Sequence, residues 1–231
     1  MIDKTCLLEY IQTLFKDGMT LMVGGFGVPG TPFTLIDALL EAGAGGLTLI
    51  KNEANEDHLG LSRLIEAGRA TKLITSHLGL NATVIGMMNR GQIEVEFYPQ
   101  GILAEKIRAG GAGLRGILTD IGIDTILAQN KDLITIDGQR VMIEPALRAD
   151  VALIHAAAAD AFGNLVFEKS ARNFNPAMAT AADTVIVETE RLAATGELAP
   201  DAIHTPGGFV DHVVVLDQLS DEYGVLEHHV L

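Results

Sequence analysis

The sequence contains a single cysteine and no tryptophan, and each shortage excludes something. Because Cys6 is the only thiol, no disulfide can form within the chain, and we expect a protein of the reducing cytoplasm. Aromatic residues make up only 5% of a sequence that is 48% hydrophobic, so the core must be built from Leu, Ile, Val and Ala. That composition is typical of parallel strands buried beneath helices.

Basic residues are also scarce, since 16 Lys and Arg stand against 30 Asp and Glu, a formal net charge of −14. This balance excludes nucleic acid as a natural partner. No hydrophobic run reaches the roughly 18 residues of a membrane span, and the most apolar segment, Val151 to Ala159, is interrupted by His155. The first residues include Asp3 and Glu9 and lack the profile of a signal peptide, so we expect no membrane partner.

The most distinctive stretch runs from Asp17 to Pro32 and reads as a turn, a short strand, a glycine-rich loop and a helix start. We call the loop, Gly24 to Gly30, the elbow. Thr31 is predicted as the N-cap of the following helix, with Pro32 at its first position. A strand that passes through side-chain-free backbone into a helix N-terminus exposes several N–H groups, which suits a phosphate, a carboxylate or a developing oxyanion.

The elbow also satisfies a dinucleotide fingerprint, with glycines at Gly25, Gly27 and Gly30 and an acid, Glu53, about twenty residues further on. Pro29 and Pro32 argue against it, because both would fall in the first turns of the helix that the fingerprint requires. A binding module for NAD(P) that uses this elbow remains the alternative hypothesis.

Strand and helix patterns alternate along the first half of the chain, which predicts a parallel sheet. The second half adds a strong hairpin signal at Asp137-Gly138. We predict one α/β domain over residues 1–231, an open, mainly parallel sheet flanked by helices with a small antiparallel insert. The predicted helices are 5–16, 31–40, 59–67, 80–89, 99–108 and 176–182, and the predicted strands are 19–23, 47–50, 72–75, 93–97, 133–136, 140–143, 150–155, 164–167, 184–188 and 210–216.

The elbow stretch resembles the amino-terminal signature of the family I CoA-transferases: Asp-Gly, an apolar strand, Gly-Gly-Phe, then Gly and Pro at fixed offsets. Further strings in the same order look like the alpha subunit of 3-oxoacid or acetate CoA-transferases. They are Pro99-Gln100-Gly101, Ile107 to Gly113, Gly163-Asn164-Leu165, Ala171-Arg172-Asn173-Phe174-Asn175-Pro176 and Ile203 to Gly207. The resemblance implies a chain that handles CoA and acyl-CoA as substrates, without a permanently bound cofactor, together with short-chain acids.

The resemblance also implies site residues. Gln100, in its Pro-Gln-Gly setting, would line the active site and donate to the oxyanion of a thioester under attack. The elbow residues Gly24, Gly25, Phe26, Gly27 and Gly30 would approach CoA closely, so that Gly25→Val should spare folding and reduce activity. Asn52 matches a family position, whereas Glu53 and Asp120 depart from the usual pattern, and Glu53 should either point away from the site or narrow the substrate range.

Other candidates have two open interpretations or a structural one. Arg172 with Asn173 could clamp a phosphate or carboxylate, or could hold a loop and a partner's acid. His155 is predicted to be a core histidine with satisfied hydrogen bonds rather than a base. Glu227, His228 and His229 lack a spaced third ligand pattern, so no metal site is expected.

The family's nucleophile is a glutamate in an E-x-G motif of the beta subunit. Here E-x-G occurs at Glu41 and Glu66, each at the predicted C-terminal end of a helix, where glycine is an ordinary cap. That end of the helix dipole does not favour an activated carboxylate. We therefore expect half of an enzyme, an alpha subunit that pairs with a beta subunit and works by a ping-pong mechanism.

Overall fold

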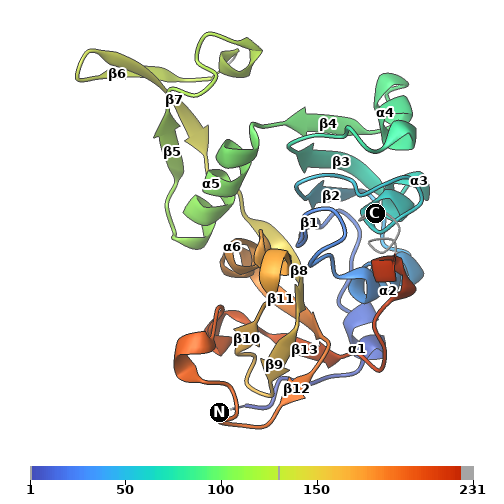
Figure 1. Ribbon diagram of the computed structural model, residues 1–231. Coiled ribbons are helices and arrows are strands. Elements are labelled where there is room, and N and C mark those ends of the chain that lie inside the picture. Colours follow the sequence, from blue (N-terminus) through green and yellow to red (C-terminus); the bar gives the residue numbers. More distant parts are fainter. Residues whose placement is uncertain (1, 130, 225–231) are drawn as a thin grey trace.

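The computed structural model describes residues 2–129 and 131–224, and its centre is a seven-stranded sheet in the order β13-β11-β8-β1-β2-β3-β4 (Figure 1). Every neighbouring pair in this sheet is parallel, as the alternation of strands and helices predicted. Its strands are β1 (Thr20–Val23), β2 (Leu47–Ile50), β3 (Ala70–Thr75), β4 (Glu94–Phe97), β8 (Ala149–Ala156), β11 (Ala182–Thr189) and β13 (His212–Val215).

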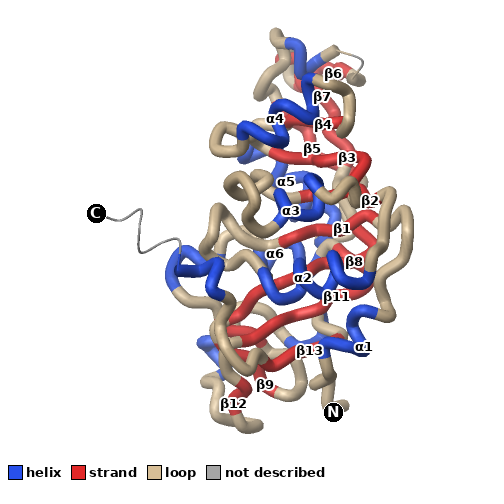
Figure 2. The backbone as a smooth tube through the Cα atoms, turned by 90° about the vertical axis from the view of Figure 1, so that its right-hand side faces the viewer, coloured by secondary structure: helices blue, strands red, loops and turns tan. Residues whose placement is uncertain are grey.

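Helices cover both faces of the sheet (Figure 2). Alternate strand residues point to opposite faces, and both sets are apolar, so each face needs a cover. Leu21 and Leu73 belong to one buried cluster, whereas their neighbours Met22 and Ile74 belong to the other. The first cluster packs beneath α1 (Leu8–Gln12), α2 (Phe33–Ala42), α3 (Leu61–Glu66) and α4 (Ala82–Asn89), and the second beneath α5 (Gln100–Gly111) and α6 (Asn175–Thr180). The predicted flanking of the sheet by helices is confirmed.

Two small sheets complete the chain. The predicted antiparallel insert is present as β5 (Gly116–Thr119), β6 (Leu133–Ile136) and β7 (Gln139–Pro145), in the order β5-β7-β6. Asp137 and Gly138 both have positive φ, 50° and 80°, as a tight hairpin turn requires. The second sheet contains β9 (Ala158–Asp160), β10 (Leu165–Val166) and β12 (Leu192–Ala193). Short 3-10 helices are η1 (Ile126–Ala128), η2 (Lys169–Arg172), η3 (Pro200–Ala202), η4 (Gly207–Phe209) and η5 (Asp221–Gly224).

A buried ion cluster joins the insert to the main body. Glu144 on β7 lies 2.7 Å from Lys106 on α5 and also binds Lys131, and both lysines lie over the ring of Tyr98. Glu144 and Lys106 are 1% and 2% exposed, so this pair is desolvated. Burial lowers the pKa of Lys106, while the carboxylate of Glu144 acts in the opposite direction.

Two details of the sequence-based prediction are wrong. The first helix was expected from Thr5, but Lys4 and Cys6 pair with β13 instead: Val213 N donates to Lys4 O and Cys6 N donates to Val213 O. Regular helix therefore begins only at Leu8. Within the described ranges, no helix is both long enough and apolar enough to cross a membrane.

The start of α2 also differs from expectation. Pro32, not Thr31, takes the cap position, and it has no side-chain cap bond. Instead, the buried carboxylate of Glu188, at the end of β11, accepts a hydrogen bond of 2.9 Å from Leu35 N and a further one from Thr34 N. A carboxylate at a helix N-terminus satisfies the unpaired N–H groups and complements the helix dipole.

Candidate active site

Four neighbouring strands of the main sheet end at the same edge, and the segment after each carries a candidate site residue. The elbow follows β1, Asn52 follows β2, Ser76 follows β3 and Gln100 follows β4. The carboxyl edge of an open parallel sheet is where ligands bind in such folds. Gln100 Nε2 donates a hydrogen bond of 2.9 Å to Asn52 Oδ1, and Ser76 Oγ lies 2.9 Å from the same oxygen. Two predicted site residues therefore meet across the end of β3.

Glu53 turns toward the elbow and is only 5% exposed. Its Oε1 accepts from Lys51 Nζ at 2.8 Å and from Gly27 N at 2.9 Å, while its Oε2 accepts from Asn52 Nδ2 at 2.5 Å. Burial lowers the pKa of the fully buried Lys51, and the neighbouring carboxylate acts in the opposite direction. Glu53 thus points inward, into the wall of the site.

Three elbow glycines are required by packing within the chain, so the expectation that Gly25→Val spares folding is wrong, while the approach of CoA to the elbow stays a prediction. A Cβ at Gly25 would lie 2.1 Å from Thr31 Oγ1, and φ there is +100°. The space beside Gly24 and Gly30 is also occupied: a Cβ would lie 1.9 Å from Asn175 Oδ1 at Gly24 and 2.3 Å from Ala171 O at Gly30. At Gly27 a Cβ would meet only Pro29 Cδ, at 3.9 Å, which is an ordinary contact, so of these four glycines only Gly27 has room for a side chain. Phe26 beside it is 45% exposed.

The arrangement does not favour the dinucleotide alternative. In that fingerprint the glycine N–H groups receive a pyrophosphate and the acid binds a ribose. Here the Gly27 N–H already donates to Glu53, so the two parts of the fingerprint bind each other. The helix also begins at Phe33, after the elbow, as the prolines indicated.

Arg172 and Asn173 lie at the end of η2 and take different roles. Asn173 Nδ2 donates to Pro29 O at 2.9 Å, so this side chain holds the elbow from outside. Arg172 is exposed near His204, whose pKa is lowered by burial and by the arginine's charge. No hydrogen bond in the described part of the chain joins Arg172 to Asn52 or Gln100. The two predicted residues are therefore adjacent, but only Asn173 joins the elbow.

His155 is a satisfied core histidine, as predicted. It is 2% exposed, and its ring nitrogens lie 2.9 Å from Glu188 Oε1 and 3.0 Å from Glu190 Oε1. Burial lowers the pKa of His155, but the hydrogen bonds and charges of both carboxylates outweigh it and raise that pKa to about 9. The ring of Tyr223 lies 5.1 Å from the imidazole, centroid to centroid.

Asn175 is a structural residue of the site that the sequence alone did not single out. It is fully buried, its Nδ2 donates to Gly30 O and Ala171 O, and its Oδ1 accepts from His155 N. It thereby ties the elbow to β8 and η2. The available signal was its place directly before Pro176 at the start of α6.

The sequence prediction overlooked a third E-x-G, Glu222-Tyr223-Gly224 in η5, whose carboxylate accepts from Gly60 N and Arg63 Nη1. Neither Glu41 nor Glu66 lies at the carboxyl edge. Glu41 is near the C-terminal end of α2 and accepts from Gln12, and Glu66 ends α3 and is bound by His58 and Ser62. Gly43, which follows Glu41, is the left-handed cap of α2. Within residues 2–129 and 131–224, no three His, Cys, Asp or Glu side chains are placed to hold a metal ion. Glu227, His228 and His229 lie outside the described residues.

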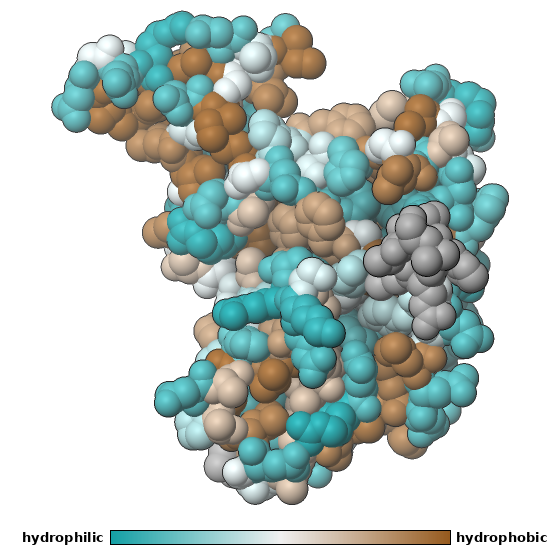
Figure 3. Space-filling view, in the orientation of Figure 1, coloured by the Kyte–Doolittle hydropathy of each residue, from teal (hydrophilic) through white to brown (hydrophobic). Residues whose placement is uncertain are grey.

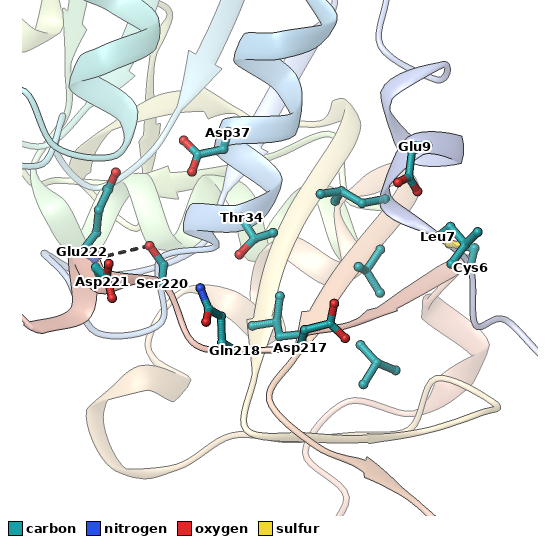
Figure 4. Close-up of a pocket in the computed structure, with 14 residues that line it drawn as sticks. Cys6, Leu7, Glu9, Thr34, Asp37, Asp217, Gln218, Ser220, Asp221 and Glu222 are labelled. Carbon is teal, nitrogen blue, oxygen red and sulfur yellow. Dashed lines mark hydrogen bonds between the residues drawn. The ribbon is translucent and has the colours of Figure 1, made fainter.

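A groove of about 670 Å³ lies elsewhere, between α1, α2 and the segment after β13 (Figure 4). Its lining includes Cys6 and the acids Glu9, Asp37, Asp217, Asp221 and Glu222, but no Lys or Arg. Burial raises the pKa of the Cys6 thiol, which leaves it a poor nucleophile. An acidic lining does not favour a polyanion such as CoA, and none of the predicted site residues takes part in it.

The family model described as coenzyme A transferase matches residues 6–216. The chain belongs to the coenzyme A transferase family. It is 47% identical over 215 residues to the acetate CoA-transferase subunit alpha of Escherichia coli K12, covering 93% of this chain and 98% of that one. It is 50% identical over 200 residues to a probable coenzyme A transferase subunit alpha of Bacillus subtilis 168, covering 86% and 87%. The predicted family I alpha-subunit type is confirmed.

Among solved structures, the fold is similar to an acyl-CoA transferase of Escherichia coli O157:H7 in a thioester complex with CoA, at a TM-score of 0.84 and 24% identity. The match covers 94% of this CoA-transferase chain and 48% of that chain. This chain therefore spans about half the length of that solved transferase. The predicted fold class is confirmed.

Proposed function

We propose that this chain is the alpha subunit of a two-chain CoA-transferase that moves CoA between a short-chain acyl-CoA and a carboxylic acid of the acetate, acetoacetate and butyrate class. A beta subunit supplies the nucleophilic glutamate. The observation that carries the proposal is the pairing of Gln100 with Asn52 at the carboxyl edge, in a chain whose E-x-G glutamates, Glu41, Glu66 and Glu222, all accept hydrogen bonds from its own residues.

The reaction begins when the partner's glutamate carboxylate attacks the thioester carbonyl. The CoA thiolate leaves and a mixed anhydride remains; the thiolate then attacks the glutamyl carbonyl, which releases the first acid and forms a glutamyl thioester. The second acid reverses these two steps and leaves as its CoA ester. Each attack places negative charge on a carbonyl oxygen. Gln100 is exposed and spends one N–H on Asn52, so its other N–H is the donor for that oxygen.

CoA and its acyl esters are the substrates, and no permanently bound cofactor is needed. We assign contacts to the substrate to Gly27 and Phe26 on the open side of the elbow, whereas the fully buried Asn52 holds Gln100 from behind. Gly24, Gly25 and Gly30 shape the elbow, and Asn173 holds it. Arg172 is an exposed cation beside Asn173 that suits a CoA phosphate or a substrate carboxylate in a chain of net charge −14.

An apolar surface on the insert supports a protein partner. Brown side chains gather on the arm at the upper left of Figure 3, which is formed by β5, β6 and β7. The exposed members include Leu118, Ile121, Ile126, Leu133, Ile134 and Ile136. Large apolar surface of this kind marks interaction sites in soluble proteins. A beta subunit is the partner that the proposed chemistry requires, and the cytoplasm is the compartment we propose.

Coexpression with a beta-type chain tests the proposal. The complex should convert acetoacetyl-CoA and labelled acetate into acetoacetate and labelled acetyl-CoA with ping-pong kinetics, whereas this chain alone should not. Robust transfer by this chain alone would contradict the half-enzyme proposal. Calorimetric titration with NAD, NADP and CoA distinguishes this proposal from the dinucleotide-binding alternative. A dinucleotide module must bind NAD or NADP.

A further inference from the structure

A continuous chain of hydrogen bonds runs from the elbow to Gln100. Gly27 N donates to Glu53 Oε1 at 2.9 Å, and Asn52 Nδ2 donates to Glu53 Oε2 at 2.5 Å. Gln100 Nε2 then donates to Asn52 Oδ1 at 2.9 Å. Glu53 and Asn52 are 5% and 0% exposed, so water does not compete for these bonds. The chain connects two parts of the site that lie after different strands, β1 and β4.

In this series of hydrogen bonds, the chemistry of Glu53 decides which group donates and which accepts. An ionised carboxylate can only accept hydrogen bonds, whereas an amide presents donors on one side and an acceptor on the other. Three donors converge on Glu53: Lys51 Nζ, Gly27 N and Asn52 Nδ2. Lys51, at 2.8 Å, supplies the compensating positive charge.

Because Glu53 accepts, Asn52 must turn its NH2 group toward it and its Oδ1 away. That oxygen can only accept, so Gln100 must turn its own NH2 group toward Asn52. Reversing the Asn52 amide would place its Nδ2 opposite Gln100 Nε2, so that two donors would face each other. The orientation of the Gln100 amide, and with it the direction of its second N–H, is thus set by a carboxylate two links away.

We propose that Glu53 is a positioning residue for Gln100, acting through Asn52 to hold the Gln100 N–H that faces the substrate. This inference rests on the proposed function in so far as Gln100 is the oxyanion donor. It assigns Glu53 a role inside the wall of the site, in place of contact with the substrate acid.

The decisive variant is Glu53→Gln in the complex with the beta-type chain. Because Lys51 Nζ and Gly27 N both need an acceptor, the glutamine keeps its oxygen toward them and presents its NH2 group to Asn52, which favours the reversed Asn52 amide. Misplacing one catalytic group typically lowers turnover by about a hundredfold or less. We expect kcat to fall by about ten- to a hundredfold while KM changes little, because the substrate contacts remain.

A double-variant cycle tests whether Glu53 acts through Gln100. If it does, Glu53→Gln combined with Gln100→Ala should be no slower than Gln100→Ala alone. Independent effects would multiply instead, and that result would overturn the proposal. Glu53→Gln strands the buried Lys51 charge; if that variant does not fold, the pair change Lys51→Met with Glu53→Gln takes its place, because it removes both charges.

The matched control is Asp160→Asn. Asp160 is also 5% exposed, and it accepts from backbone N–H groups and from an asparagine amide, Asn164 Nδ2 at 2.7 Å. This cluster lies in the β9-β10-β12 sheet and has no contact with Asn52 or Gln100 among the described residues. Asp160→Asn should lower the melting temperature without changing kcat. An equal loss of kcat in both variants would reduce the Glu53 effect to destabilisation and overturn the proposal.

A measurement without turnover separates this inference from the proposed function. In the 15N-labelled full chain, the side-chain amide resonances of Asn52 and Gln100 should shift or double in Glu53→Gln and stay unchanged in Asp160→Asn. Unchanged Gln100 resonances would overturn the proposal even if the complex transfers CoA. If the complex transfers no CoA but these resonances respond, the proposed function fails and the positioning of Gln100 by Glu53 stands.

Discussion

The hydroxyl of Tyr223, in η5, donates a hydrogen bond of 2.5 Å to the carbonyl of Thr31, at the end of the elbow. Glu222 beside it accepts from Gly60 N at 2.8 Å and from Arg63 Nη1 at 2.6 Å. Residues from the last described segment therefore fasten the elbow and the start of α3. Burial raises the pKa of the Tyr223 hydroxyl, so it remains a donor at physiological pH.

Tyr223→Phe should lower the free energy of unfolding by about 1 kcal/mol, because Thr31 O loses its partner while the ring packing against Phe33 is kept. Denaturant unfolding at neutral pH measures the loss. Tyr10→Phe, at a ring that is 48% exposed, is the control and should change little. Equal unfolding midpoints for both variants would contradict the role of this hydroxyl.

Stability should fall as the pH rises from about 6.5 to about 9, because His155 has a pKa raised to about 9 from 6.5. A group with a raised pKa binds more protons in the folded state, so its contribution is complete below the unfolded pKa and is lost above the folded one. The change should be of the order of 3 kcal/mol. Urea unfolding of His155→Gln should lack this component; if wild type and variant lose stability in parallel over this range, the titration belongs elsewhere.

Gly25→Ala should destabilise the chain by about 3 kcal/mol or more, because its Cβ would overlap Thr31 and its φ is +100°. Gly27→Ala is the matched comparison: its φ is +61° but the space around it is open, so only about 1 kcal/mol of backbone strain is expected. Thermal melts of both variants decide the matter. Similar melting temperatures would contradict the packing role of Gly25.

Gln100→Ala should lower kcat and kcat/KM together by on the order of a hundred- to a thousandfold, as expected for one lost oxyanion donor. Gln100→Glu should be slower still, because it places a carboxylate where negative charge develops. Steady-state kinetics of the complex provide the test, and size-exclusion chromatography verifies that the subunits still assemble. Full turnover in an assembled Gln100→Ala complex would remove this residue from the mechanism.

Glu144→Gln should cost about 3 kcal/mol of stability, because it leaves Lys106 and Lys131 near each other without their buried counter-charge. Glu105→Gln, on the helix α5 that also carries Lys106, breaks the exposed pair with Arg108 and should cost less than about 1 kcal/mol. Urea unfolding of the two variants measures the difference. If the two losses are equal, burial of the Glu144 cluster contributes nothing to the attachment of the insert.

The fold was largely readable from local patterns. The apolar runs of β1, β2 and β3, and the Asp137-Gly138 turn, carry their structure in neighbouring residues, so periodicity and turn chemistry identify them. β9 and β12 were missed because they have only three and two residues, too few to show a period of two. β5 was missed for a similar reason, within a stretch without clear periodicity.

The site was predicted only in part, because its contacts join distant residues. Gln100 and Asn52 each follow a strand, which placed them at one edge of the sheet, but their hydrogen bond depends on the order of β2, β3 and β4. The cap of α2 comes from Glu188, far along the chain, and local rules pointed to Thr31 instead. The substrate contacts of the site residues, and the single domain over residues 1–231, remain predictions.

The place of β1 in the main sheet has a consequence for synthesis of the protein. β1 pairs with β2 on one side and with β8 on the other, so Leu21 meets Leu49 early and Val151 only late. At about 5 to 20 residues per second, roughly 5 to 20 s pass on the ribosome between the appearance of these two partners. Through that interval the edge of β1 that later pairs with β8 has no partner strand. Nascent chains of this subunit should therefore depend on chaperones that shield such edges until residue 156 has emerged.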